Sequence, residues 1–394
     1  MNTATAIETI KQLLAIPSTA DNPEALAQAV DFMATFVAMH VDDVTIERFE
    51  SNGKPSFLAY RGDVRPAKFD VLLNAHLDVV PGAPDQFKAV EKNGRLYGRG
   101  AFDMKAAAVV ESLVFCELVH DVPFELGLQI VSDEEIGGFD CALYQIEQGV
   151  RADFILTGEH TLAPNIIYTA ARGLAWAEIA FKGKTAHGGY PWRGRNALLA
   201  ATEYIRRVLK RYPTPAEEAW TASVNVADIE TGNQTFNAVP DNAVIKLDFR
   251  FTPEAHEFAT KESFEQLLFS FDPNIEILDI PVFDTAISVA HDNLHVQALA
   301  RALEQTSGTP AEFGRRFAGG DSRHFTKVGG HAVEFGLTGG HMHGSDEYVD
   351  IAAIDKYRAT LRRFLRDEKL SSRNERIRCG GVKLRSVDNT PLSR

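Results

Sequence analysis

Six acidic or imidazole residues, spread over most of the chain, have the chemistry to bind metal ions. They are His76, Asp103, Glu134, Glu135, Glu159 and His343. Each follows an apolar run or lies in a glycine-rich turn. Zinc accepts imidazole nitrogens and carboxylate oxygens, and two histidines with four or five carboxylates can serve a pair of divalent ions. The residue types therefore predict a two-metal site.

Strands are expected to position most of these side chains. Three apolar segments lead directly to candidate residues: 71–75 to His76, 124–131 to Glu134 and Glu135, and 154–157 to Glu159. Open α/β sheets place their sites at the carboxyl ends of strands. Strands alternate with helical patterns to about residue 168, which predicts a mainly parallel sheet covered by helices on both faces.

A different pattern follows residue 172. The expected elements are strand 174–181, helix 197–209, strands 222–229 and 243–251, helix 261–269 and strand 275–280. The order βαββαβ predicts an inserted ferredoxin-like α+β domain. The first pattern then returns, with helix 295–305, strand 332–335 and helix 351–365. We therefore expect a discontinuous first domain (1–172 and 281–370), an inserted domain (173–280) and a disordered tail (371–394).

Composition narrows the classes of function. The 394 residues suggest two domains, and a formal net charge of −13 argues against nucleic acid as the main partner. No apolar run is long enough to cross a bilayer, and the first residues lack the pattern of a secretory signal. Cys116, Cys141 and Cys379 form no spaced framework, which favours a reducing cytoplasm as the location.

The motifs, taken in their order, resemble those of the M20 family of metallopeptidases and amidohydrolases. That family includes desuccinylases, deacetylases, aminoacylases and carboxypeptidases. The matching segments are 74–81, 97–105, 132–135, 158–159, 187–197 and 343–347. The resemblance extends to about residue 365. It implies a mainly parallel α/β catalytic domain and an inserted α+β domain that acts as a lid and as a dimer interface.

The resemblance also implies the metal ligands. His76 and Glu159 would hold one ion, Glu135 and His343 the other, and Asp103 would bridge the two. Zinc is expected, with cobalt or manganese as alternatives. A bridging carboxylate holds two ions about 3.5 Å apart, close enough to share one water-derived ligand. His341 is a competing imidazole two residues before His343.

Five further residues receive roles from the resemblance. Glu134 would be the general base, although two consecutive residues of a strand point in opposite directions, so a bend is needed to bring both Glu134 and its neighbour to the site. Asp78 would fix the tautomer of the first histidine ligand. His187 would donate to the oxyanion, often in the partner subunit's site. Asn237 and Arg250 would contact the substrate carboxylate.

The predicted activity is therefore hydrolysis of the amide bond of an N-acyl amino acid or a small peptide with a free carboxylate, by a homodimer. Residues 319–325 resemble the family's glycine-rich substrate loop but depart from the Gly-Gly-Thr-Ser-Asp form of desuccinylases. This departure weakens a prediction of succinyl-diaminopimelate as the substrate. The alternatives are a dipeptidase or aminopeptidase, and a metal-binding protein without turnover.

Overall fold

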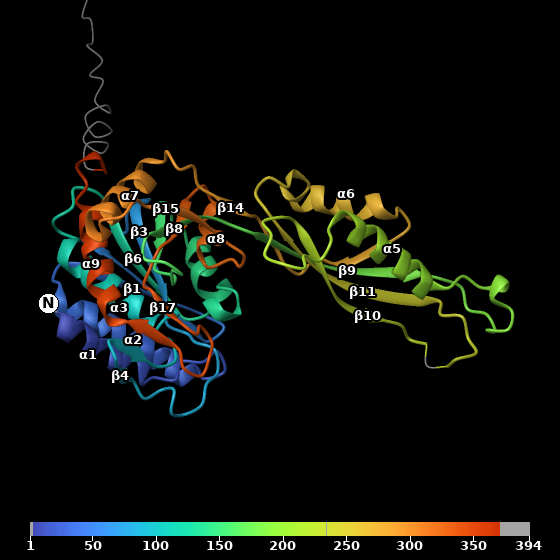
Figure 1. Cartoon of the computed structure of the whole chain (residues 1–394), viewed down its shortest axis with the longest axis horizontal. Helices are drawn as coiled ribbons and strands as arrows, with labels where there is room; N and C mark the ends of the chain where they lie inside the picture. The colour runs from blue at the N-terminus through green and yellow to red at the C-terminus, as the bar shows by residue number, and fades with distance from the viewer. Residues whose placement is uncertain (1–2, 234, 371–394) are drawn as a thin grey trace, which may run out of the picture. The chain divides into compact units, whose positions relative to one another are not determined.

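The computed structural model describes residues 3–233 and 235–370, which fold into two compact units (Figure 1). The first unit takes the described residues of Met1–Ile167, His291–Glu312 and Phe335–Arg394, and the second takes Tyr168–Ala290 and Phe313–Glu334. The predicted inserted domain falls within the second unit, which also includes 313–334. The domain boundaries proposed from the sequence stay a prediction, and the predicted tail lies outside the described residues.

Five strands of the first unit form the scaffold of the candidate site. In spatial order they are β1 (Val44–Ser51), β2 (Lys54–Arg61), β6 (Leu126–Val131), β3 (Phe69–His76) and β7 (Ala152–Thr157). Strand β3 pairs in parallel with both β6 and β7, whereas β2 runs antiparallel to β1 and β6. Every residue of β6 is buried, as expected for a strand that is covered on both faces.

Helices enclose these strands. They are α1 (Thr3–Leu14), α2 (Pro23–His40), α3 (Lys105–Leu118), α4 (Tyr144–Glu147), α7 (Leu294–Ser307) and α9 (Ile351–Leu365). Helix α3 is buried along nearly its whole length because it packs on β3, β6 and α9. The helices predicted at 295–305 and 351–365 are present as α7 and α9. The mixed, partly parallel α/β architecture confirms the predicted fold class.

A small antiparallel sheet in the first unit was not predicted. Its spatial order is β17 (Gly339–Gly340), β18 (Tyr348–Asp350), β5 (Arg95–Tyr97) and β4 (Val90–Lys92). These strands have only two or three residues, too few to show a period-2 pattern. The pairing of Tyr348 with Tyr97 nevertheless joins two segments that lie 251 positions apart in the chain.

The second unit contains an antiparallel sheet with two helices. The sheet has the order β10 (Ser223–Glu230), β11 (Asn242–Phe251), β9 (Gly173–Lys182) and β12 (Glu276–Asp279), with β13 (Phe283–Asp284) also on β9. Helices α5 (Ala197–Arg211) and α6 (Lys261–Phe271) pack beside each other over it (Figure 1). In chain order these elements read β9-α5-β10-β11-α6-β12, which is the predicted βαββαβ arrangement.

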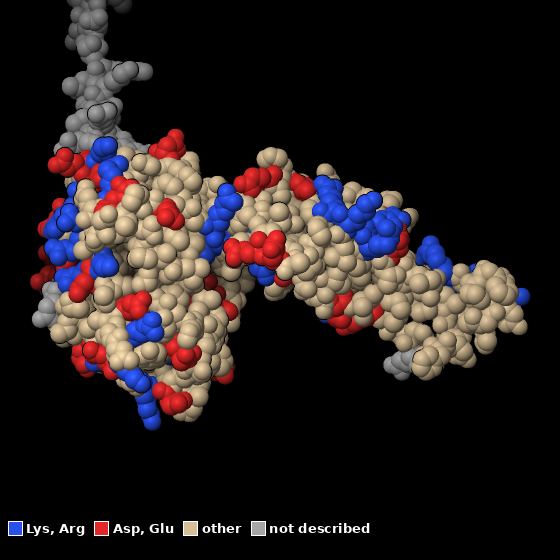
Figure 2. All heavy atoms as spheres, viewed as in Figure 1, with Lys and Arg blue, Asp and Glu red and all other residues tan. Residues whose placement is uncertain are grey.

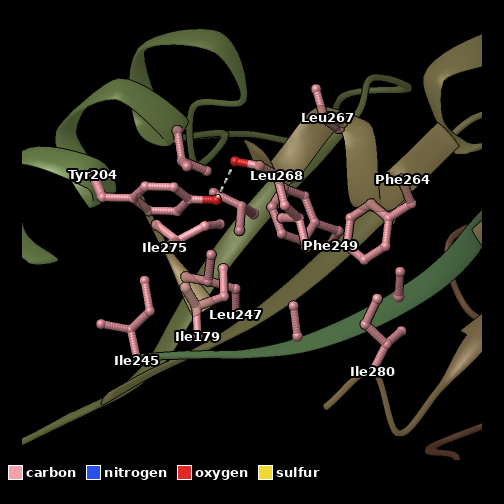
Figure 3. Close-up of a cluster of buried hydrophobic side chains, with 14 of the residues drawn as sticks. Ile179, Tyr204, Ile245, Leu247, Phe249, Phe264, Leu267, Leu268, Ile275 and Ile280 are labelled. Atoms are coloured by element: carbon pink, nitrogen blue, oxygen red, sulfur yellow. Dashed lines mark hydrogen bonds between the residues drawn. The ribbon is translucent and has the colours of Figure 1, made fainter. Parts of the chain in front are cut away.

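The core of this unit is strongly aromatic and aliphatic. Alternate residues of β9 and β11 point inward, so that Ile179, Leu247 and Phe249 lie in one buried cluster with Phe264 of α6 (Figure 3). The buried Tyr204 hydroxyl donates to the carbonyl of Leu268, which joins α5 to α6. A buried polar group with such a partner avoids the cost of desolvation without a hydrogen bond.

The remaining elements of the second unit are short. They are β14 (Ile287–Ser288), α8 (Ser322–Thr326), β16 (His331–Glu334), the single turns η3 (Pro191–Arg193) and η4 (His256–Phe258), and most of β8 (Ile166–Ala171) and β15 (Glu312–Arg316). Acidic and basic side chains are interspersed in the view of Figure 2. The net negative charge is therefore not collected into one large acidic surface in that view.

Candidate metal centre

Three parallel strand ends form the base of the site. The register pairs His76 at the end of β3 with Val131 at the end of β6, and Asn74 with Thr157 at the end of β7. The residues that follow β6 and β7 therefore emerge beside His76, and Glu159 is among them. Gly158 allows this approach, since an added Cβ would lie 2.4 Å from Glu111 Oε1 and 2.9 Å from the Tyr357 hydroxyl.

A sharp turn delivers the two adjacent glutamates. Glu134–Ile136 forms a single 3₁₀ turn (η1) just after β6, and it ends at Gly137 and Gly138, which both have left-handed φ angles of 116° and 64°. Successive residues of such a turn do not alternate between opposite faces as strand residues do. The bend that the sequence required at this pair is therefore present. The Glu135 amide also donates to Asp78 Oδ2 at 2.9 Å.

The small sheet brings the other two candidate ligands together. Strand β5 leads into the turn that carries Asp103, and β18 begins just after the loop that carries His343. Because the strands are antiparallel and Tyr97 pairs with Tyr348, both loops leave the sheet at the same end. His341 instead places its Nδ1 2.5 Å from Asp346 Oδ2 and is exposed. The geometry thus favours His343 over His341.

Two ligand sets share one carboxylate. In the first set (His76, Asp103, Glu159), His76 Nε2 lies 3.1 Å from Asp103 Oδ1 and 3.5 Å from Glu159 Oε1. In the second set (Asp103, Glu135, His343), His343 Nε2 lies 3.3 Å from Asp103 Oδ2 and 3.2 Å from Glu135 Oε1. Each oxygen of Asp103 faces one set, as a bridging carboxylate would.

The imidazoles and carboxylates of the two sets shift one another's pKa values strongly. Burial alone would lower the pKa of His76, but Asp103, Asp78 and Glu159 together raise that pKa well above its ordinary value. Hydrogen bonds to Asp103 and Glu135 raise the pKa of His343 to about 10. Burial opposes ionisation of Asp103, yet the two imidazoles lower its pKa well below the usual range. In the metal-free fold the carboxylates therefore favour positive charge at both imidazole positions.

The donor set fits a pair of divalent metal ions. Each set offers one imidazole nitrogen and carboxylate oxygens, all within 4.8 Å of one another. Zinc binds these atom types, and three protein ligands leave a position open in a catalytic site. Divalent ions would supply the positive charge that protons on the imidazoles otherwise provide.

Glu134 and Asp78 lie next to the first set. Glu134 Oε2 is 4.0 Å from His76 Nε2, and its side chain is mostly buried. His76 Nδ1 contacts the Asp78 main-chain oxygen at 3.0 Å, and the Asp78 carboxylate at 3.5 Å. The ring is thus oriented by the main chain at least as closely as by the carboxylate that the sequence singled out. Asp78 also touches the second set through the amide of Glu135.

The other predicted site residues lie in the second unit. His187 is exposed, and its Nδ1 accepts a hydrogen bond from the Gly189 amide at 3.1 Å. A neutral imidazole that accepts at Nδ1 carries its proton at Nε2, so the outer nitrogen is a donor. The Asn237 carbonyl accepts from the Gly188 amide at 2.6 Å, which places Asn237 beside His187. Arg250, on β11, makes two hydrogen bonds to Asp248 instead, at 2.9 and 3.2 Å.

The glycine-rich substrate-loop motif is tightly anchored within the second unit. Arg323 Nε lies 2.8 Å from Asp284 Oδ2, and Lys327 also pairs with Asp284. Arg323 Nη1 donates to the carbonyl of Gly320 at 2.8 Å. The basic residue that departs from the desuccinylase form therefore has a partner in this chain, Asp284, which the sequence alone did not reveal.

Sequence reasoning missed several polar residues next to the ligand sets. Arg99 and Glu347 occur within the quoted motifs but received no role, and they form a buried ion pair. His160 follows Glu159 directly, and its Nδ1 lies 3.3 Å from Glu159 Oε2. The Arg99 and Glu347 positions could have been suspected because each lies within four residues of a ligand in the chain.

Comparison with known proteins decides the family. The model of peptidase family M20/M25/M40 matches residues 72–367. The chain belongs to this family. Membership makes it a metallopeptidase or amidohydrolase of the M20 group and implies a dinuclear metal site, for which the buried His, Asp and Glu cluster is present. The predicted resemblance and enzyme class are confirmed.

Relatives of this M20 protein are named as desuccinylases or as peptidases. A succinyl-diaminopimelate desuccinylase from Herminiimonas arsenicoxydans is 27% identical over 344 residues, covering 81% of this chain and 89% of the relative. Aminopeptidase PepT from Bacillus cereus matches the fold with a TM-score of 0.72 at 17% identity, covering 94% and 99%. The metallo-carboxypeptidase Sso-CP2 from Sulfolobus solfataricus matches the fold with a TM-score of 0.70 at 21% identity, covering 93% of this chain and 99% of that protein.

Among the described residues, no helix of this M20 protein is long and apolar enough to cross a membrane.

Proposed function

We propose that this protein hydrolyses the amide bond of an N-acyl amino acid or small peptide with a free carboxylate, using two divalent metal ions. The observation that carries the proposal is the shared Asp103, whose two oxygens face His76 at 3.1 Å and His343 at 3.3 Å. When bound, the two ions would lower the pKa of a water molecule and polarise the scissile carbonyl. Zinc remains our prediction for the native metal.

Glu134 is the proposed general base. Its carboxylate lies 4.0 Å from His76 Nε2, on the 3₁₀ turn that also presents Glu135 to His343. We assign it to take a proton from the attacking water and to return that proton to the leaving amine. A positioned carboxylate can transfer protons to and from a reacting group in this way. Asp78 orients His76 and the amide of Glu135.

The substrate proposal stays at the level of a chemical class. The desuccinylase relatives act on an acyl amino acid according to their name, which supports this class. The Asp321-Ser322-Arg323 sequence departs from the desuccinylase loop, and Arg323 is committed to Asp284. We therefore do not assign succinyl-diaminopimelate. Asn237 and Arg250 remain proposed contacts for a substrate carboxylate, although Arg250 would have to leave Asp248 or bind both groups.

Two variants at the glutamate pair test the proposal. Glu134→Gln should retain two metal ions and lose turnover of N-acyl amino acids or dipeptides by at least ~10², the scale of general-base catalysis. Glu135→Gln, its matched neighbour, should instead lower metal content. Metal analysis and steady-state kinetics of both proteins decide the matter. Metal loss in the first variant and full occupancy in the second would exchange the two roles.

His187 is proposed to donate to the oxyanion, in a homodimer formed through the second unit. Support comes from the exposed His187 ring, whose Nδ1 accepts from Gly189 and leaves Nε2 as the donor, and from β10, an edge strand that pairs only with β11 among the described strands and exposes Ile229. His187→Ala should depress turnover and leave metal content intact, because the donor acts on charge that develops in the transition state. Mixing the His187→Ala protein with the Glu134→Gln protein should restore part of the activity. No recovery after confirmed subunit exchange would contradict action across the dimer.

A further inference from the structure

The second ligand set depends on the loop between β17 and β18, which carries His343. His343 has a φ of 61° and His341 a φ of 57°, both in the left-handed region that residues other than glycine rarely adopt. The His343 side chain is 41% exposed, whereas the His76 side chain is 1% exposed. Neither burial nor regular structure therefore explains how the His343 ring is held at the carboxylates.

A buried ion pair connects this loop to the loop of the shared carboxylate. Arg99 and Glu347 are 3% and 1% exposed, and Arg99 Nη1 donates to Glu347 Oε2 at 2.5 Å. The second nitrogen of the same guanidinium, Nη2, donates to the carbonyl of His343 at 2.9 Å. Oxygen Oε1 of Glu347 accepts from the amides of Phe102 at 3.0 Å and Asp103 at 3.2 Å. Each partner thus contacts the main chain of one metal ligand.

We propose that Arg99 and Glu347 are positioning residues that set the distance between Asp103 and His343, so that Arg99 controls binding of the second metal ion and Glu347 controls binding of both. The inference rests on the proposed two-metal function. It predicts a selective effect: Arg99 reaches the main chain of His343, which belongs only to the second set. Glu347 reaches the main chain of Asp103, which belongs to both sets.

The chemistry of the pair explains why these residue types occur there. A planar guanidinium has donors in a fixed fork, so it can bind a carboxylate and a carbonyl at the same time. A lysine ammonium keeps the charge but lacks that geometry. Gln86 also connects the two loops. Its Nε2 donates to the carbonyl of Gly344 at 2.9 Å, and its own carbonyl accepts from the Arg99 amide at 2.8 Å.

Stepwise metal binding tests the proposal. Metal-free protein is titrated with Co²⁺ by calorimetry, and the absorption spectrum is recorded after each equivalent. For Arg99→Lys we expect an unchanged first equivalent and a second equivalent weakened about 10- to 100-fold, the scale for residues that orient metal ligands. Glu347→Ala should weaken both equivalents. Glu347→Gln keeps an oxygen for the Asp103 amide and should resemble Arg99→Lys.

A matched control separates positioning from general stability. Arg358 forms a partly buried ion pair with Glu117 in the same unit, and neither residue belongs to a ligand set. Arg358→Lys should leave both equivalents unchanged even if it lowers the thermal midpoint. The double variant Arg99→Lys with Glu347→Gln should bind the second ion no more weakly than the worse single variant, because both break one interaction.

The outcomes distinguish the possible failures. Wild-type protein that binds no Co²⁺ would overturn the proposed function itself. Wild-type protein that binds two ions, with Arg99→Lys unchanged or weakened equally in both equivalents, would overturn only the positioning role. A Glu347→Ala protein that fails to fold leaves the decision to Arg99→Lys and Glu347→Gln, since both retain the size and polarity of the native side chains.

Discussion

The two ligand sets are built differently although they share Asp103. The first set lies at the carboxyl ends of parallel strands, and its histidine and glutamate side chains are 1% and 8% exposed. The second set is carried by a 3₁₀ turn and a long-range loop, and its side chains are 11% and 41% exposed for Glu135 and His343. Pairing within the parallel sheet therefore supports the first set, whereas the pairing of the short strands β5 and β18 and side-chain contacts support the second.

This difference predicts different properties for the two ions. A buried ligand set held by main-chain pairing changes little between the metal-free and metal-bound states, so binding costs little reorganisation. A set on loops must order a partly exposed histidine, and water competes for its nitrogen. We expect the ion of the second set to be the weaker and more readily exchanged of the two.

The largest predicted difference is in the stability of the metal-free protein after removal of each histidine. In metal-free protein, His76→Ala leaves buried carboxylates without their cation and should destabilise the fold by about 3–5 kcal/mol, as for other broken buried ion pairs. His343→Ala removes a half-exposed imidazole and should cost at most about 1 kcal/mol. Urea unfolding with EDTA present measures both losses, and metal analysis should show a deficit in each variant. Equal destabilisation by the two variants would contradict the comparison.

A smaller effect should appear in the pH dependence. The pKa of His343 is about 10 in the metal-free fold and about 6.5 as its ordinary value, so its proton stabilises the metal-free fold most fully below pH 6.5. That contribution is lost as the pH rises through about 10. A metal ion requires the neutral ring and must displace this proton, so affinity for the second ion should rise over the same range.

Two titrations check these opposite slopes. Unfolding of metal-free protein should show a stability that falls between pH 7 and pH 10, with a smaller fall in His343→Ala. Calorimetry in buffers of different ionisation enthalpy should show proton release with the second equivalent at pH 7. Binding of the second metal ion without proton release would mean that His343 is not a ligand or is not protonated in the metal-free fold.

Much of this protein could be predicted from its sequence. The apolar strands that end at His76 and before Glu159, and the βαββαβ order of the second unit, are local patterns. A strand can be predicted from the apolar pattern of its own residues. Parallel neighbouring strands place their carboxyl ends at the same edge of the sheet. The family motifs added the acidic turn at Glu134 and Glu135. These features need no knowledge of contacts between distant segments.

The tertiary structure decided what local patterns cannot encode. Strands of two or three residues carry no periodic signal, yet the pairing of β5 with β18 brings the loop of Asp103 to the loop of His343. The resemblance to the family had already favoured His343 over His341, and the geometry supports that choice, but the buried pair of Arg99 and Glu347 depends on this pairing. Burial and long-range distance are properties of the folded chain, because Arg and Glu are mostly exposed in proteins and only the packing of distant segments buries this pair.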